Sequence, residues 1–120
     1  MKIFKLSGLL VVFVAGISAP SIALAGGWTN PAVPSNVQIV RTEGFLIAGP
    51  FGNPGPCGNA DYIWISATHP QYKELLSTAL TALGGGLKLT AYVHSCSVVS
   101  WWSAATIGEL SSSGALMVSR

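Results

Sequence analysis

Two stretches of the chain, residues 61–67 and 87–94, alternate between apolar and polar side chains. In an extended chain such alternation puts the apolar side chains on one face, so each stretch predicts a strand that covers a core. Runs rich in β-forming residues predict further strands at residues 37–42, 45–48 and 115–118, and one or two strands within residues 98–110. The first two of these runs are compatible with a strand pair or with one long strand bent at Gly44.

One amphipathic helix is expected between the two alternating stretches. Its apolar positions recur at helical spacing and are Tyr72, Leu75, Leu76, Ala79, Leu80 and Leu83. Thr68 with Gln71 matches a capping box, and Pro70 suits the first turn. The glycine triplet at 84–86 is suited to the end of the helix. The predicted order is β-β-β-α-β-β-β, a mainly β domain of the α+β class with one central helix.

Residues 1–25 have the organisation of a cleaved secretion signal. Lys2 and Lys5 precede an apolar run, which is followed by Pro20 and by a small-residue motif that ends at Ala25. The apolar run is shorter than the roughly 20 residues that a membrane-spanning helix needs. The mature protein is therefore expected in the periplasm or outside the cell, with no membrane span.

The mature chain is expected to have two parts. Residues 26–35 contain two prolines and no periodic pattern, which predicts an extended N-terminal arm. Residues 36–120 are enough for one core and form a single domain. Cys57 and Cys96 are the only cysteines of an exported chain, so a Cys57–Cys96 disulfide is expected. Two free thiols or a pair of metal ligands is the alternative.

The mature chain has little charge and no excess of either sign. Its four basic and four acidic side chains are Arg41, Lys73, Lys88, Arg120, Glu43, Asp61, Glu74 and Glu109. Binding to nucleic acid depends on several lysine or arginine contacts acting together, so we exclude that class of partner. A surface so poor in charge gives little protection against self-association, which fits a homo-oligomer.

No motif for catalysis, a cofactor or a metal ion is present in the sequence. Nucleophile motifs, phosphate loops, paired histidines and cysteine-pair metal spacings are all missing. His69 adjoins Pro70 at the expected helix start, where a capping or surface role is more common than catalysis. Asp61, His69 and a serine could be drawn as a triad, but no spacing supports the geometry that a triad requires. We therefore expect a protein that is not an enzyme and that carries no cofactor or metal.

Aromatic side chains on outward faces are the candidate ligand-binding residues. The predicted set is Tyr62, Trp64, Tyr92, His94, Trp101 and Trp102. Trp101 and Trp102 are adjacent, so in a strand they point to opposite faces and cannot both enter one core. Exposed aromatic rings suit sugar stacking or a subunit contact. Packing of these rings beneath the N-terminal arm or the helix is the alternative.

Three segments carry a resemblance to a known family. They are Ile63-Trp64 in a strand, Tyr72-Lys73-Glu74-Leu75-Leu76 at the helix start, and the turn from Gly86 into residues 87–93. The set resembles the OB-fold B subunits of pentameric bacterial toxins, in the subtilase-cytotoxin and pertussis-like branch. The resemblance implies a small OB-like barrel of five strands capped by a helix. It further implies a pentameric ring, a glycan ligand on a cell surface, and an A-type partner chain.

The predicted function is that of a secreted, non-enzymatic binding module that recognises cell-surface carbohydrate, like a toxin B subunit. The alternative is an exported structural or inhibitory protein that binds another protein through the same aromatic surface. A glycan array together with the native mass separates these two functions.

Overall fold

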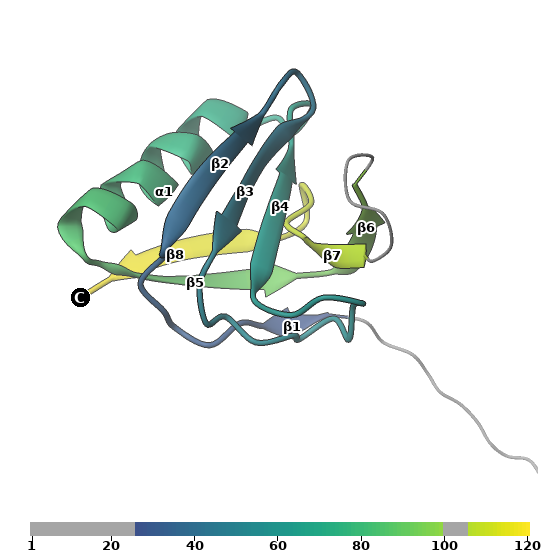
Figure 1. Ribbon diagram of the computed structural model, residues 1–120, viewed down its shortest axis with the longest axis horizontal. Coiled ribbons are helices and arrows are strands. Elements are labelled where there is room, and N and C mark those ends of the chain that lie inside the picture. The colour runs from purple at the N-terminus through teal and green to yellow at the C-terminus, as the bar shows by residue number, and fades with distance from the viewer. Residues whose placement is uncertain (1–25, 100–105) are drawn as a thin grey trace, which may run out of the picture.

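Two β-sheets and one helix make up the computed structural model, which describes residues 26–99 and 106–120 (Figure 1). The elements are β1 (Gly27–Trp28), β2 (Asn36–Val40), β3 (Gly44–Ala48), β4 (Tyr62–Ser66), α1 (Tyr72–Gly85), β5 (Lys88–Val93), β6 (Ser95–Val98), β7 (Thr106–Glu109) and β8 (Ala115–Ser119). The prediction of a mainly β domain with one helix is confirmed. The strand count is larger than in the predicted order, because the arm contributes β1, and residues 95–98 and 106–109 form two separate strands, β6 and β7. The expected signal segment, residues 1–25, lies outside the described residues.

The strands form a five-stranded sheet and a three-stranded sheet. The larger sheet has the order β2-β3-β4-β7-β6, with β4 and β7 parallel and every other pair antiparallel. The smaller sheet has the order β1-β5-β8 and is antiparallel. The described strands do not close into a barrel, since β2 and β6 each remain an edge of the larger sheet. The expected closed barrel is therefore not observed in this part of the chain.

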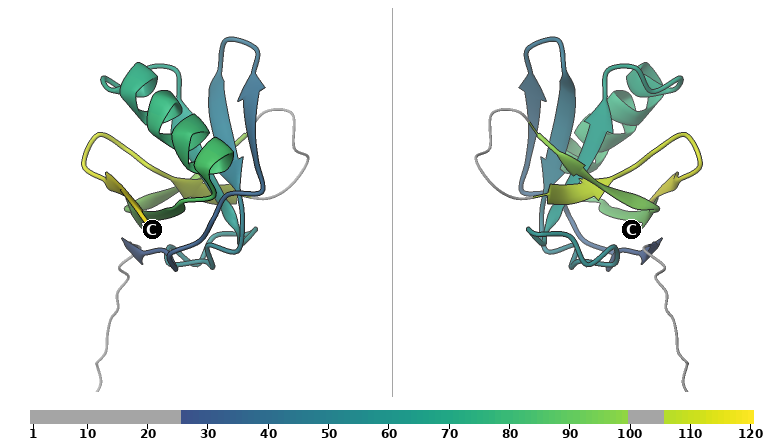
Figure 2. Two further views of the ribbon diagram at one scale, coloured as in Figure 1. Left: turned by 90° about the vertical axis from the view of Figure 1, so that its left-hand side faces the viewer. Right: turned by 90° about the vertical axis from the view of Figure 1, so that its right-hand side faces the viewer.

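The helix lies in the angle between the two sheets and covers the main core (Figure 2). It contacts β2 of the larger sheet and both β5 and β8 of the smaller one. The fully or almost fully buried core side chains are Ala32, Phe45, Ile47, Phe51, Ile63, Ile65, Leu75, Ala79, Ala82, Leu89, Ala91 and Leu110. The ring of Tyr72 in the first turn meets Phe45 edge-on with ring centroids 5.3 Å apart. No described helix has the length and apolar content that crossing a membrane would require.

The helix begins at Tyr72 without the predicted capping box. Gln71 occupies the N-cap position, but its side chain makes no capping hydrogen bond. The Thr68 hydroxyl instead bonds the Ser66 hydroxyl at 2.9 Å. The Gln71 amide donates to Nδ1 of His69 at 3.0 Å, so the imidazole bonds the backbone directly before the helix. The capping-box prediction is therefore wrong, and the role expected of His69 near the helix start fits this contact.

A second, smaller apolar cluster covers the opposite face of the larger sheet. Its buried members are Val40, Leu46, Trp64, Val99 and Ile107, with Tyr62 packed against them. Trp64 is only 6% exposed. The expectation that the outward face of residues 61–67 is free is therefore wrong for Trp64, because β4 is the middle strand of five and both of its faces are covered.

Gly44 is the point where the Trp64 ring crosses the start of β3. A Cβ atom built on Gly44 would lie 2.2 Å from the Ile65 carbonyl oxygen and 2.7 Å from the Trp64 ring. The φ angle of Gly44 is 154°, which residues with a side chain rarely adopt. Glycine is thus required at this turn by both the close approach and the backbone conformation.

Gly44→Ala is expected to lower the free energy of unfolding by about 2–4 kcal/mol, because it combines overpacking with backbone strain. Gly84→Ala in α1 is the matched control, since nothing lies within 4 Å of its added methyl group. In a helix this change is expected to add up to about 1 kcal/mol of stability. Urea unfolding of the mature protein measures both effects, and equal stability of the two variants would contradict this account.

The predicted disulfide between Cys57 and Cys96 is present and joins the glycine- and proline-rich loop to β6. Hydrogen bonds hold the same loop from within. The Asn53 side chain accepts from the Cys57 amide and donates to the Cys57 carbonyl, both at 2.8 Å. The Gly58 amide donates to the Thr106 hydroxyl at 2.8 Å. The loop is therefore fixed to β6 and β7 at several points.

The double variant Cys57→Ala/Cys96→Ala is expected to unfold about 2–4 kcal/mol more easily than the oxidised protein, because the bond closes a long loop in the unfolded chain. Reduced wild-type protein serves as the control and is expected to match the double variant. Urea unfolding with and without reductant measures the difference. No loss of stability in either sample would show that the disulfide is not a stabilising link.

Candidate functional site

Three rings lie close together on the outer face of the smaller sheet, where Tyr92 contacts both Trp28 and His94. The Trp28 ring meets Tyr92 edge-on, with ring centroids 5.2 Å apart and planes at 83°. The His94 ring also lies beside Tyr92, with centroids 4.8 Å apart. Trp28 remains 51% exposed, and His94 is also exposed. We call this set the aromatic cluster.

The N-terminal arm fixes Trp28 in the cluster by pairing with β5. Trp28 is directly opposite Tyr92 in the antiparallel register, so the two side chains share a face. The Thr29 amide donates to the Ala91 carbonyl at 2.8 Å, and the Ala91 amide donates to the Thr29 hydroxyl at 2.9 Å. Thr29 is buried, so both bonds are shielded from water. The arm is thus a third strand of the smaller sheet and not a free tail.

The face that carries the aromatic cluster continues onto β8. Ala115 is opposite Tyr92, and Met117 is opposite Thr90. Met117 is 51% exposed. The outer face of the smaller sheet therefore combines exposed rings and an exposed thioether with polar ring atoms.

A polar pocket of about 210 Å³ lies between the β4–α1 connection and the β7–β8 turn. Its lining residues are Ser66, Thr68, His69, Pro70, Glu109, Ser111 and Ser112. We call this hollow the serine pocket. Its walls carry hydroxyl groups, one carboxylate and one imidazole, which is a chemistry suited to a polar ligand.

Both histidines of the chain hold the β7–β8 turn through its backbone carbonyls. Nε2 of His69 lies 3.1 Å from the Ser111 carbonyl oxygen. Nε2 of His94 lies 3.1 Å from the Ser113 carbonyl oxygen. Because Nδ1 of His69 accepts from the Gln71 amide, its Nε2 is the atom that carries the proton and donates. The β7–β8 turn therefore lines the serine pocket and is also bonded to His94 of the aromatic cluster.

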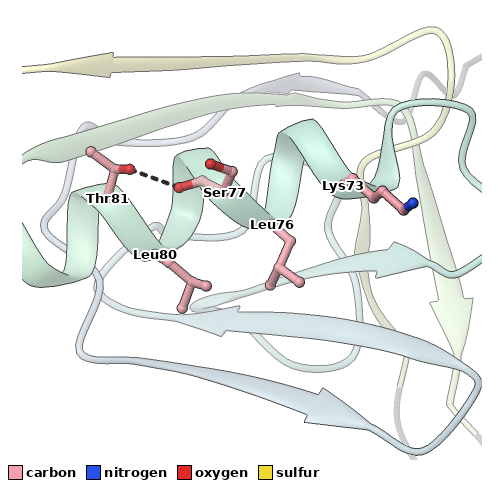
Figure 3. A pocket seen from close by; sticks show the side chains of 5 residues that line it. All are labelled: Lys73, Leu76, Ser77, Leu80 and Thr81. Carbon is pink, nitrogen blue, oxygen red and sulfur yellow. Dashed lines mark hydrogen bonds between the residues drawn. The ribbon is translucent and has the colours of Figure 1, made fainter.

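A second hollow, of about 450 Å³, runs along α1 (Figure 3). In the view of Figure 3, Leu76 and Leu80 point toward the larger sheet and Lys73 points away. The Thr81 hydroxyl is occupied, since it donates to the Ser77 carbonyl at 2.8 Å. This surface offers apolar contact and few free polar groups, so it suits a protein contact better than a polar ligand.

The structure brings together two of the six predicted ligand-binding residues, Tyr92 and His94. Tyr62 and Trp64 lie on the larger sheet, where Tyr62 is half-buried and Trp64 is buried. Trp101 and Trp102 lie outside the described residues. The Trp64 ring is not available for stacking as it stands.

Sequence reasoning missed Trp28 and most of the serine pocket. A tryptophan in an arm rich in proline and small residues is a usable signal, because the arm has no core of its own to bury the ring. The run of serines at 111–113 marks a turn, but nothing in it shows that the turn meets the start of the helix.

No family model, curated protein or solved structure matches the chain. Within residues 26–99 and 106–120, no cluster of three or more histidine, cysteine, aspartate or glutamate side chains could hold a metal ion. We therefore infer the function of the site from its geometry.

His69→Ala is expected to lower the free energy of unfolding by about 1–2 kcal/mol, because it removes one bond to the helix start and one to the turn. The Gly114 amide, which donates to the Ser111 carbonyl, is expected to exchange with solvent faster. His94→Ala, which removes a single bond to the turn, is the comparison and is expected to have a smaller effect on stability. Hydrogen exchange followed by NMR measures the turn directly, and unchanged Gly114 exchange in His69→Ala would contradict the anchoring role.

Proposed function

We propose that this protein is an exported, non-enzymatic binding module that recognises cell-surface carbohydrate through the aromatic cluster. The observation that carries the proposal is the half-exposed Trp28 ring, held edge-on to Tyr92 in a rigid sheet. Aromatic rings of this kind stack on the apolar faces of sugars, while the indole N–H, phenol and imidazole offer hydrogen bonds at the rim. A fixed platform also loses little conformational entropy when a ligand binds.

The proposed module assembles with copies of itself into a ring, a pentamer by the resemblance to toxin B subunits. Apolar side chains exposed away from the aromatic cluster support self-association. They include Leu80 and Leu83 on α1, and Val118 on β8, an edge strand among the described strands. Equal numbers of acidic and basic side chains after residue 25 leave little repulsion between copies. A ring would present several weak sugar sites at once and so bind a cell surface with high avidity.

The sheet topology supports the proposal of an OB-like fold. One helix connects β4 to β5, and β7 returns parallel to β4. OB folds are partly open barrels that bind oligosaccharides as well as oligonucleotides. The equal numbers of acidic and basic side chains after residue 25 favour oligosaccharides here. Export and an A-type partner chain belong to the same proposal and follow from the expected signal segment and from the resemblance.

A second candidate function is binding of another protein. The position of β8 favours it, because β8 is an edge strand among the described strands and both Met117 and Val118 are exposed. An extended segment of a partner can add to such an edge as a further strand. In this alternative the aromatic cluster forms part of the protein contact.

Trp28→Ala is expected to reduce glycan binding by the mature protein at least about fivefold, since stacking on one aromatic ring contributes about 1 kcal/mol or more. Ile39→Ala is the matched control, because it removes an exposed apolar side chain from the other sheet. A glycan array measures binding, and native mass spectrometry of the same samples measures assembly.

Binding of glycans by an oligomer, lost in Trp28→Ala and kept in Ile39→Ala, supports the carbohydrate function. A monomer that binds no glycan would contradict that function and favour the protein-binding alternative. Binding that survives in Trp28→Ala would show that the aromatic cluster is not the site.

A further inference from the structure

We infer that the serine pocket is a second carbohydrate subsite, which takes one uncharged sugar unit and holds its adjacent hydroxyl groups on the Glu109 carboxylate. This inference rests on the proposed carbohydrate function and specifies its ligand class. The volume of about 210 Å³ is below that of a typical site for a drug-sized ligand, so it fits a single sugar ring and not a chain of them.

Glu109 lines the pocket, and only part of the hydrogen-bonding capacity of its carboxylate is used within the protein. It is the last residue of β7 and is directly opposite Trp64 of β4 in the parallel register. One carboxylate oxygen accepts a hydrogen bond from the Ser97 hydroxyl. Among the described residues, Glu109 has no ion pair with a lysine, arginine or histidine. The half-buried carboxylate therefore retains capacity to accept hydroxyl groups of a ligand.

The other residues that line the pocket supply hydroxyl groups that can accept or donate hydrogen bonds. The Ser66 and Thr68 hydroxyls bond each other and keep further capacity for a ligand, since each hydroxyl has two acceptor sites and one donor. The Ser111 hydroxyl accepts from the Ser113 amide at 3.3 Å, so its own proton is available to a ligand. His69 keeps the Ser111 wall in place through its bond to the carbonyl.

The charge of the pocket selects against acidic sugars. Glu109 is the only carboxylate among the lining residues, and the lining contains no lysine or arginine. His69 does not offset this charge, because Nδ1 is an acceptor in its bond with the Gln71 amide. A sugar carboxylate placed here would face Glu109 without a cation to screen it, whereas neutral hydroxyls gain charge-assisted hydrogen bonds.

The experiment is an NMR titration of the isotope-labelled mature protein. The probes are the uncharged methyl glycosides of galactose, mannose and glucose, with N-acetylneuraminic acid as the acidic probe and glucosamine as the cationic one. We expect at least one uncharged glycoside to shift the NMR signals of the Ser111 and Ser112 amides, with affinity at least about tenfold above that of the acid.

Glu109→Gln keeps an acceptor for Ser97 but removes the charge, and is expected to lower the affinity for the uncharged glycoside about tenfold. Glu74→Gln on the exposed surface of α1 removes the same charge elsewhere and is expected to leave the affinity unchanged.

Three results would overturn the inference: no shift with any uncharged glycoside, equal affinity for the acid, or an unchanged affinity in Glu109→Gln. A shift with glucosamine alone would also overturn it and identify a site for cations. The glycan array separates this failure from that of the proposed function. If the array binding is lost in Trp28→Ala but unchanged in Glu109→Gln, the pocket is not a subsite and the carbohydrate function stands. If neither the array nor the titration detects sugar binding, both the carbohydrate function and the subsite are overturned.

Discussion

The pairing of the N-terminal arm with β5 is the interaction on which the proposed recognition surface depends. Two hydrogen bonds between Thr29 and Ala91 are buried, and they set the register that places Trp28 opposite Tyr92. Without this pairing the Trp28 ring would belong to a solvated tail and would lose its orientation. The bridge between Ala32 and Leu89 extends the same contact and brings Ala32 into the main core. The same segment of the arm therefore contacts both the main core and the aromatic cluster.

Local patterns predicted much of this fold because their causes are local. The alternation in residues 61–67 and 87–94 matches β4 and β5, and helical spacing from Tyr72 matches α1. The glycine triplet ends the helix as expected, with Gly86 in the left-handed conformation. The helix start was not predictable in the same way, because the N-cap side chain makes no capping hydrogen bond and the Gln71 amide bonds the imidazole of His69. Alternation also shows only that two faces differ, and so it could not show that a second apolar cluster covers Trp64.

The candidate site was less predictable because distant segments build it. Tyr92 and His94 follow from the alternation of one strand, but Trp28 joins them through a contact across more than half of the mature chain. The serine pocket combines the start of the helix with the end of β7 and the turn that follows it. Its only local signal is a run of small polar residues, which is as typical of an ordinary turn. The two histidines bring these parts together, since each donates to the same turn from a different connecting segment.

The most direct test of carbohydrate recognition is to observe a glycan in contact with the aromatic cluster. Intermolecular nuclear Overhauser effects can be measured between the mature protein and a glycan that it retains on the array. This account predicts effects from the ring protons of Trp28 and Tyr92 to carbon-bound protons on one face of a sugar. Effects that arise only from residues outside the smaller sheet would contradict it.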